Sequence, residues 1–255
     1  MGHPPGAPFF NLTGKFFTLF ASDASQVALM VNLMSATLSA FTILFLFWTI
    51  THIAKKIIVQ NGLEITLGQS ITILGSGLIG ALVYAFSDTF WFSATEAEVY
   101  AYSSFFTAIV FWLILKWEDK HDKPSSDKYL ILIAYLMGLS IGVHLLNLLT
   151  IPTLVLVYYF RKTENPSLKG GIWALGISFA ILAFIMYGFI PQFIANAGIT
   201  ELFFVNTLGF SFNSGAFFYY LTTIAVYRDW ETQPPSPGRQ YQTDNRATRT
   251  QSTAS

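Results

Sequence analysis

Long stretches without charged side chains alternate with short charged loops along this chain. The uncharged stretches are mostly apolar, and they cover residues 24–54, 65–87, 99–115, 129–160, 170–200 and 202–227. A helix that crosses a membrane needs about 20 predominantly apolar residues. The pattern therefore predicts an all-α polytopic membrane protein.

The ends of the uncharged stretches set the helices that we expect. A short amphipathic helix in the membrane interface is expected from residues 9 to 20. Small side chains recur four apart within residues 76–81, a spacing that lets two membrane helices approach closely. The membrane helices, about six or seven in number, are expected at residues 24–53, 66–87, 95–117, 129–146, 149–160, 170–190 and 214–227, and the helix that starts at residue 170 is expected to stop at Pro191.

Residues 129–160 are too long for one ordinary membrane helix and short for two. Asn147 and Pro152 interrupt the apolar run, since proline lacks the backbone N–H that a helix interior needs. We therefore expect two short antiparallel helices that meet at a turn between His144 and Pro152. A single long helix would instead move the basic residues after Phe160 to the opposite side of the membrane.

The charged loops divide by sign. Basic residues gather in three places, at Lys55 and Lys56, between residues 116 and 128, and between residues 161 and 169. Basic loops of membrane proteins stay on the cytoplasmic side, and the expected helices bring all three clusters to that side. The opposite, outer face then receives the turns that carry Asp88, Glu96, Glu98, His144 and Glu201.

Composition narrows the function classes. Only 11% of the 255 residues are charged, the formal net charge is zero, and no stretch is basic enough to indicate nucleic-acid binding. The absence of cysteine excludes disulfides and thiolate metal sites. No phosphate-binding Walker loop, dinucleotide fingerprint or zinc-protease helix is present, so a substrate delivered on a lipid fits better than a soluble nucleotide.

Two parts of the chain are expected to behave differently. Residues 1–228 form the predicted transmembrane domain. Residues 229–255 are rich in Pro, Gln, Ser, Thr and Arg and predict a disordered tail. The abrupt change in composition at this point is also compatible with a tail that is not native to the protein.

The turn from Asp88 to Tyr102 is the richest in chemistry. Carboxylates at a membrane face, such as Glu96 and Glu98, can act as general bases or bind a metal. They can equally form capping boxes, Ser93 with Glu96 and Thr95 with Glu98, at the start of the next helix. Residues two apart on a helix point to nearly opposite sides, so both carboxylates can face one cavity only if the helix begins between them.

His144 belongs to a polar stripe. Ser140 and Asn147 share its face at helical spacing, and polar groups within membrane helices usually face the bundle interior. One interpretation is a histidine hydrogen-bonded between helices. The other is a ligand for an anionic group such as a phosphate.

Three segments together resemble a known family. They are residues 3–8, which read His-Pro-Pro-Gly-Ala-Pro, residues 90–100, which contain Thr-Glu-Ala-Glu-Val-Tyr, and residues 138–147, which end in His-Leu-Leu-Asn. Over residues 2–226 the chain resembles the bacterial protein O-mannosyltransferase-like membrane proteins, long described as a domain of unknown function and of the GT-C glycosyltransferase type.

The resemblance implies a GT-C-like bundle and an activity. Such enzymes take a sugar from a polyprenyl-phosphate donor and transfer it to a protein hydroxyl at the outer, periplasmic face of the bacterial cytoplasmic membrane. The resemblance implies that Glu96, Glu98, His144 and His3 line or border the outer cavity. We predict Glu96 and Glu98 as catalytic residues, and as substrate-binding residues we predict His3, Tyr100, His144 and Asn147. A divalent metal is compatible with this chemistry, although no residue is assigned as its ligand.

The family pattern has further parts that this sequence lacks. A first helix and an acidic loop normally precede the His-Pro-Pro-Gly turn, and Met1 stands in their place. The C-terminal half of the family pattern is missing as well. We therefore expect a fragment of a glycosyltransferase-like protein that lacks the catalytic carboxylate of the family pattern and is inactive as it stands.

Two other functions remain open from the residues alone. A transporter or flippase could line its pathway with the same polar residues, although no internal repeat of the kind that transporters often carry is visible. A non-catalytic membrane scaffold would need none of the acidic positions.

Overall fold

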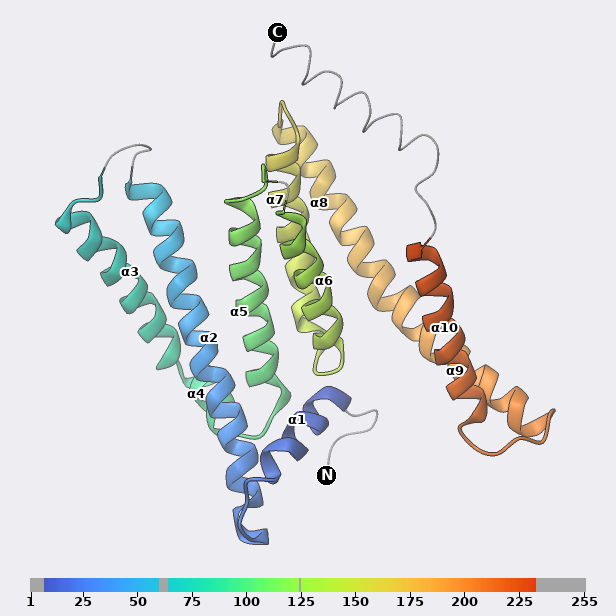
Figure 1. Cartoon of the computed structure of the whole chain (residues 1–255). Coiled ribbons are helices and arrows are strands. Elements are labelled where there is room, and N and C mark those ends of the chain that lie inside the picture. Colours follow the sequence, from blue (N-terminus) through green and yellow to red (C-terminus); the bar gives the residue numbers. More distant parts are fainter. Residues whose placement is uncertain (1–6, 60–63, 124, 233–255) are drawn as a thin grey trace. The chain divides into compact units, whose positions relative to one another are not determined.

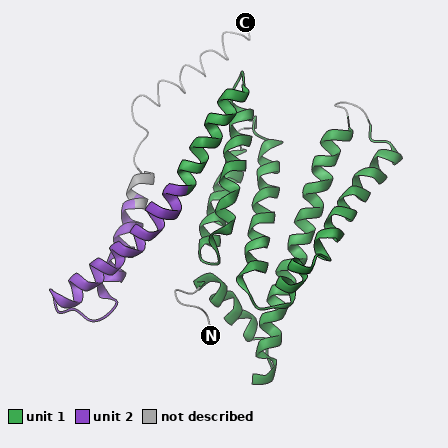
Figure 2. Cartoon of the chain, turned by 180° about the vertical axis from the view of Figure 1, so that it is seen from behind, with its two compact units in different colours: residues 1–182 green, residues 183–255 purple. Residues whose placement is uncertain are grey.

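The computed structural model describes residues 7–59, 64–123 and 125–232, and among them all regular elements are helices. The chain divides into two compact units, residues 1–182 and 183–255 (Figure 2). The predicted all-α class is confirmed. Within the described ranges four helices are long and apolar enough to cross a membrane: Ala24–Ile58, Leu67–Ala85, Val99–Glu118 and Leu168–Asn206.

Unit 1 is a bundle of antiparallel helices (Figure 1). Its elements are α1 (Pro8–Thr18), the 3₁₀ turn η1 (Ala24–Gln26), α2 (Val27–Ile58), α3 (Leu67–Ala85), α4 (Asp88–Thr95), α5 (Val99–Glu118), α6 (Asp127–Ile141), the 3₁₀ helix η2 (Leu145–Thr150), α7 (Ile151–Lys162) and α8 (Leu168–Ala183). The short helix expected at residues 9–20 is thus present as α1.

Small residues allow α3 to pack closely on α2. An added Cβ at Gly80 would lie 2.7 Å from Cδ1 of Ile50, and one at Gly77 would overlap Thr51. Both glycines belong to the small-residue pattern at residues 76–81, so the predicted close approach is confirmed. In lipid such close packing replaces the hydrophobic effect as a source of helix association.

The hairpin predicted within residues 129–160 is confirmed. Helix α6 ends at Ile141, and η2 and α7 then return along the bundle (Figure 1). Pro152 lies in the first turn of α7, where a missing N–H costs no helical hydrogen bond. The guanidinium of Arg161 at the end of α7 pairs with Glu118 at the end of α5, so the third basic cluster lies at the same end as the second.

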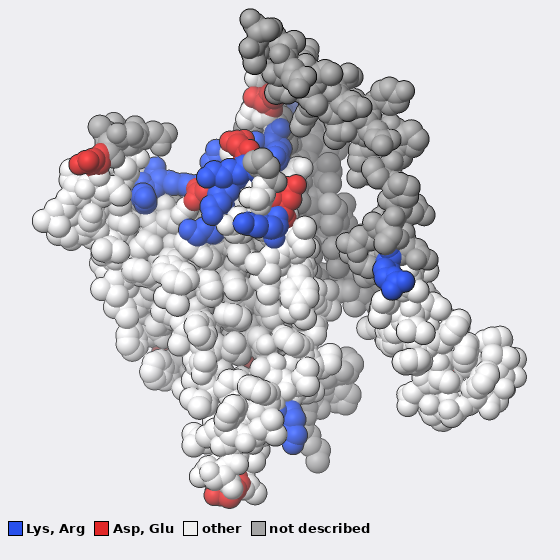
Figure 3. Space-filling model, in the orientation of Figure 1, with Lys and Arg blue, Asp and Glu red and all other residues white. Residues whose placement is uncertain are grey.

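The basic side chains gather at one end of unit 1, where α2, α5 and α7 end (Figure 3). We call this the basic end and the opposite end of unit 1 the outer end. The separation by sign is looser than the sequence indicated, because Glu118 and Asp119 lie among the lysines. Lys15 lies on α1, which packs at the outer end.

Unit 2 corrects one predicted boundary. The helix that begins with α8 does not stop at Pro191 but continues through a π-helix (Phe184–Phe189) into α9 (Ile190–Asn206). In a π-helix each backbone N–H donates to the carbonyl five residues earlier, which shifts the hydrogen-bond register of the residues that follow. Pro191 then falls in the first turn of α9. The missing proline N–H therefore breaks no bond that the helix requires.

Helix α10 (Ser214–Thr232) completes unit 2. The carboxylate of Glu201 accepts hydrogen bonds from the backbone N–H groups of Asn213 (2.5 Å) and Ala216 (2.9 Å), and so holds the start of α10. This acidic residue, expected at a reactive face, has a structural role as a helix cap. Residues 233–255, most of the predicted tail, lie outside the described residues.

Candidate functional site

The candidate site lies at the outer end of unit 1, where the α4–α5 and α6–η2 turns lie near α1 (Figure 1). Helix α1 is fastened there by two contacts. The Phe9 N–H donates to the carbonyl of Gly142 at 2.8 Å, and the Thr13 and Tyr102 hydroxyls lie 3.2 Å apart. A backbone bond and a side-chain bond thus tie α1 to both the α6 turn and the first turn of α5.

An aromatic cluster lies beneath α1. The rings of Tyr102 and Phe106 stack with centroids 5.1 Å apart, and the Phe9 ring lies 5.7 Å from that of Tyr102. Tyr102, Phe106 and Val143 are buried. Because these side chains come from α1, α5 and the α6–η2 turn, their packing fixes the positions of the segments that carry the candidate residues.

Glu96 and Glu98 occupy the extended link between α4 and α5. Their backbones are not helical, and the Glu98 N–H donates to the carbonyl of Glu96 at 2.9 Å, which forms a tight turn around Ala97. Both residues are exposed, and neither carboxylate forms an ion pair with the described part of the chain. Because α5 begins only after Glu98, the restriction from helical spacing does not apply.

The predicted capping boxes are wrong. The hydroxyls of Ser93 and Thr95 donate to the carbonyls of Thr89 and Trp91 within α4, and so cannot cap α5. The reason is that residues 88–95 form a short helix of their own, whereas the sequence predicted that the next helix starts at Thr95. Glu98 is the N-cap residue of α5 without a side-chain cap bond, so its carboxylate remains available.

His144 and Tyr100 lie together at the mouth of the α6–η2 turn. Their ring centroids are 5.6 Å apart, and Nδ1 of His144 accepts a hydrogen bond from the Leu146 N–H at 3.1 Å. A neutral imidazole whose Nδ1 accepts carries its proton on Nε2. The Nε2–H of partly exposed His144 can therefore donate to a bound anion.

Asn147 and Ser140 are fully buried, so the predicted inward direction is confirmed for these two residues, whereas His144 of the same predicted stripe is partly exposed. The side-chain Nδ2 of Asn147 donates to Oγ of Ser140 at 3.1 Å, and the backbone carbonyl of Asn147 accepts from the Thr150 hydroxyl at 2.7 Å. The contact with Ser140 crosses the turn, and does not follow the helical spacing that the sequence predicted, because α6 ends at Ile141. These bonds stabilise the hairpin, and substrate binding by Asn147 stays a prediction.

A cavity of about 290 Å³ lies beside these residues, between the end of α3, α4 and the start of α5. We call it the outer chamber. All of its lining residues except Phe90 carry a hydroxyl group: Tyr84, Ser87, Thr89, Ser93, Tyr100 and Ser104. Aromatic faces and hydroxyl groups are suited to a small, uncharged, hydroxyl-bearing ligand.

Sequence reasoning found one chamber residue, Tyr100, and missed most of the others. Ser93 had been assigned to a cap, while Tyr84 and Ser104 lie on different helices and had no local signal. Glu96 and Glu98 are not among the residues that line the chamber, but both belong to the link that leads into α5 beside it. His3 lies outside the described residues.

A cluster that could hold a metal lies at the basic end. His52, Glu118 and Asp119 offer ligand atoms within 4.8 Å of one another. Lys56 already pairs with both carboxylates, and Arg161 pairs with Glu118, so these side chains neutralise the negative charge without a metal ion. We interpret the cluster as an ion-pair network that links α2, α5 and α7, and the predicted metal at the site stays a prediction.

These features define a polytopic helical membrane protein whose candidate site lies opposite its basic end. The sequence profile of the protein O-mannosyl-transferase TMEM260 N-terminal domain matches residues 1–167, more than half of the chain. The chain belongs to this family, and it is a glycosyltransferase-like membrane protein. Residues 168–226, to which the resemblance was expected to extend, lie beyond this match.

Two curated relatives are similar to the chain. The protein O-mannosyl-transferase tmem260 of Dictyostelium discoideum is 24% identical over 167 residues, which cover 63% of this chain and 18% of the relative. The protein O-mannosyl-transferase TMEM260 of Mus musculus is 25% identical over 142 residues, which cover 55% of this chain and 18% of the relative. The chain thus spans less than a fifth of these relatives. No solved structure matches it significantly.

The expected family is confirmed at the level of O-mannosyltransferase-like membrane proteins. The relatives come from a slime mould and a mouse, and the bacterial origin stays a prediction. The integral membrane location is supported by the helices that can cross a membrane.

Proposed function

We propose that this chain forms part of a membrane glycosyltransferase that moves a sugar from a polyprenyl-phosphate donor to a protein hydroxyl. The reaction takes place at the outer end, on the periplasmic side of a bacterial inner membrane. The relatives are named protein O-mannosyl-transferases, which supports a sugar donor and a protein acceptor. The observation that carries the proposal is the hydroxyl-lined outer chamber next to the α4–α5 link, whose Glu96 and Glu98 form no ion pair with the described residues.

Each group has a chemical task in this reaction. The acceptor oxygen attacks the anomeric carbon of the sugar, and the bond from that carbon to the phosphate oxygen breaks. Polyprenyl phosphate leaves with the electron pair, while the hydroxyl proton passes to the carboxylate of Glu98 or Glu96. The Nε2–H of His144 donates to the phosphate and stabilises the negative charge that grows on it.

We place the phosphate at His144 and the carboxylates on the far side of Tyr100, whose ring packs on His144 and also lines the outer chamber. This order suits the reaction, because a base next to the phosphate would be repelled by its charge.

The test is transfer of radioactive mannose from polyprenyl-phosphate mannose to a Ser- and Thr-containing acceptor peptide in proteoliposomes. We expect Glu98→Gln, alone or with Glu96→Gln, to lower the rate by about 10²- to 10⁴-fold, the usual contribution of a positioned base. Glu64→Gln is the matched control, because Glu64 is an exposed carboxylate in the α2–α3 loop at the basic end.

Equal rates in the parent chain and the Glu96/Glu98 double variant would disprove the assignment of the base. Uptake of a solute into the liposomes, with no sugar transferred, would instead favour the transporter interpretation.

A further inference from the structure

A strip of aromatic rings follows the seam between α2 and α5, from the middle of the two helices toward the basic end. The ring centroids of Phe45 and Phe105 lie 6.1 Å apart, and those of Trp48 and Trp112 lie 5.6 Å apart. The rings of Phe45 and Trp48 make an edge contact at 5.3 Å, and the ring of Phe41 lies 6.2 Å from that of Phe105. We call these residues the aromatic strip.

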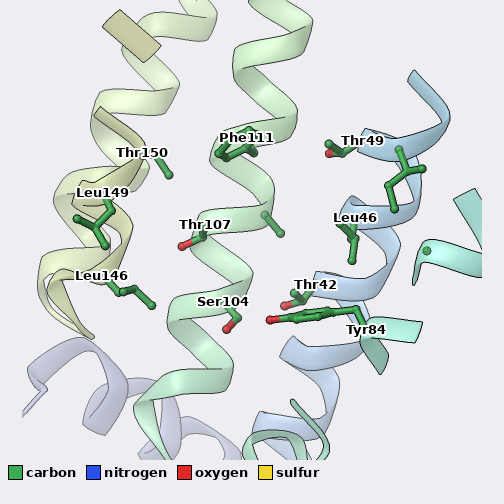
Figure 4. Close-up of a pocket in the computed structure, with 13 residues that line it drawn as sticks. Thr42, Leu46, Thr49, Tyr84, Ser104, Thr107, Phe111, Leu146, Leu149 and Thr150 are labelled. Atoms are coloured by element: carbon green, nitrogen blue, oxygen red, sulfur yellow. The ribbon is translucent and has the colours of Figure 1, made fainter. Parts of the chain in front are cut away.

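The aromatic strip lies on a different side of both helices from the cavities. Figure 4 shows the side of the seam where Thr42 and Leu46 of α2 and Ser104 and Thr107 of α5 line a cavity of about 650 Å³. At 3.6 residues per turn, the strip lies about a third of a turn away from these residues on each helix. None of its residues lines that cavity or the outer chamber. The strip is therefore a separate surface of the bundle.

Two lysines lie at the basic end of the aromatic strip. Nζ of Lys116 lies 4.1 Å from the centroid of the Trp112 ring, which is a cation–π contact. Lys55 follows Trp48 by seven residues, so both lie on the same face of α2. Neither lysine forms an ion pair with the described part of the chain. This end of the strip therefore offers two positive charges to a ligand.

The carboxylates at the end of α5 have other partners. Glu118 pairs with Lys56 and Arg161. Asp119 also pairs with Lys56, and its Oδ2 lies 3.4 Å from Nε2 of His52. The negative charge closest in sequence to the strip is thus already neutralised, and it does not cancel the charge that the strip presents to the membrane.

The length of the aromatic strip matches one leaflet of a bilayer. From Phe105 to Lys116, α5 rises about 16 Å at 1.5 Å per residue, and half of a hydrocarbon core of about 30 Å is about 15 Å. Trp48 and Trp112 then lie near the polar head groups, where tryptophan is enriched in membrane proteins. Phe41 and Trp48 are 46% and 37% exposed, so the strip is accessible from the membrane.

We propose that the aromatic strip and its two lysines bind one anionic phospholipid of the leaflet at the basic end. The anionic head group lies between Lys55 and Lys116, and one acyl chain lies along the rings toward Phe41. This lipid is distinct from the sugar donor, because it belongs to the leaflet at the opposite end of unit 1 from Glu96 and Glu98.

An anionic lipid fits this surface better than other occupants. A zwitterionic lipid offers the same acyl chains, but the cation of its head group is repelled by the lysines. A second copy of the chain, packed on the strip about a two-fold axis, would bring the lysines of both copies together. Like charges that face each other disfavour such a contact.

Fluorescence quenching by brominated lipids measures the preference at the strip. The reporter variant keeps the two tryptophans of the strip and the fully buried Trp117, and it carries three changes: Trp91→Phe, Trp173→Phe and Trp230→Phe. It is reconstituted in phosphatidylcholine vesicles that contain brominated phosphatidylglycerol or brominated phosphatidylcholine. We expect phosphatidylglycerol to bind at least about tenfold more tightly, since each lysine near a membrane surface contributes about fivefold. Equal binding of the two lipids would overturn the proposal.

Removing the lysines should remove the preference. In the reporter variant, Lys55→Gln with Lys116→Gln should bring the two binding constants to within about twofold of each other. The matched control, Lys123→Gln with Lys169→Gln, removes the same charge from exposed positions at the basic end and should keep the preference. A loss of equal size in the control would show only a general attraction of the basic end for anionic lipid, and the specific site would be wrong.

Native mass spectrometry of the chain with all its tryptophans guards against misfolding of the reporter variant. The chain is released from nanodiscs that contain equal amounts of phosphatidylglycerol and phosphatidylcholine. The parent should retain one more phosphatidylglycerol molecule than the variant with both Lys55→Gln and Lys116→Gln. Equal numbers of retained lipids would contradict the site.

A thiol in the strip tests whether a second copy covers it instead. The chain has no cysteine, so Phe41→Cys introduces a single thiol. Oxidation by copper phenanthroline in the same bilayers should give no more disulfide-linked dimer than Leu78→Cys, at an exposed position of α3. Efficient dimer formation by Phe41→Cys alone would show that another copy occupies the strip, and would overturn the lipid site.

Discussion

The two ends of unit 1 use their carboxylates in opposite ways. At the basic end Glu118 pairs with Lys56 and Arg161, and Asp119 also pairs with Lys56. At the outer end Glu96 and Glu98 have no cationic partner among the described residues. Paired carboxylates that join three helices serve the fold, whereas exposed, unpaired ones beside a cavity are candidates for chemistry.

The same contrast holds for open space. The outer chamber adjoins the outer end, and a second cavity of about 650 Å³ between α2, α3, α5 and η2 runs inward from it. Residues of α5 line both cavities. At the basic end α5 is instead held by ion pairs and by stacking of Trp117 on Tyr158 of α7, with ring centroids 5.5 Å apart. One helix is thus fixed at one end and lines ligand-sized space at the other.

The largest expected effect tests which side of the membrane each end faces. Because the chain has no cysteine, single thiols can be placed at will. Glu98→Cys should react fully with a membrane-impermeant maleimide added outside intact cells, and Lys120→Cys should react only after the membrane is opened. The reverse pattern would exchange the two ends and remove the periplasmic assignment.

The next effect concerns stability. Glu118→Ala should lower the free energy of unfolding by about 2 kcal/mol, because it removes the carboxylate that pairs with Arg161 and one of the two carboxylates that pair with Lys56, in a partly buried setting. Glu96→Ala should change it by less than about 0.5 kcal/mol, as expected of an exposed side chain that forms no ion pair with the described residues. Thermal unfolding in detergent, followed by circular dichroism, compares the two. Similar losses in both would erase the difference between the ends.

A smaller effect is expected where α1 is fastened. Tyr102→Phe removes the hydroxyl that lies 3.2 Å from Thr13 and keeps the ring stacked on Phe106. We expect a loss of about 1 kcal/mol, the net value of one hydrogen bond. Hydrogen exchange should localise the loss to α1, and Tyr135→Phe, at an exposed position of α6, is the control. Faster exchange at the basic end would argue against a local role.

The smallest effect is a pH dependence at Asp23. Hydrogen bonds from the Ser25 side chain and backbone hold the pKa of this exposed carboxyl below its ordinary value. A lowered folded pKa gives stability that is present above the unfolded pKa and is lost as pH falls through the folded one. Between about pH 5 and about pH 2.5 the thermal midpoint of the parent should therefore fall slightly more than that of Asp23→Asn. Parallel curves of thermal midpoint against pH for the parent and Asp23→Asn would show that protonation of Asp23 does not affect stability.

The sequence predicted the features that depend on local patterns. The α6–α7 hairpin followed from Asn147 and Pro152, and the gathering of basic loops followed from the lengths of the uncharged stretches. Close packing of α3 on α2 followed from the glycines at 77 and 80. Each of these rests on neighbours in sequence or on a spacing within one helix.

The missed features depend on contacts between distant segments or on backbone geometry. Nothing near Tyr84 or Ser104 indicates that they line the same cavities, because α3 and α5 are brought together by their packing on α2, between segments distant in the sequence. The sequence predicts a helix end at Pro191, because a π-helix, which shifts the hydrogen-bond register of the backbone, has no clear sequence signal. The partners of Glu118 come from α2 and α7, which no local pattern joins.

The length of α2 has a further consequence for the whole outer end. Its 32 residues extend for about 48 Å, whereas the hydrocarbon part of a bilayer is about 30 Å thick. Tilting absorbs only part of such a mismatch. Gly14 of α1 lies against Val31 in the first turns of α2, so α1 is attached to the outer end of this long helix. The helix thereby couples the height of α1 to bilayer thickness, and thicker membranes should draw it closer to the lipid head groups.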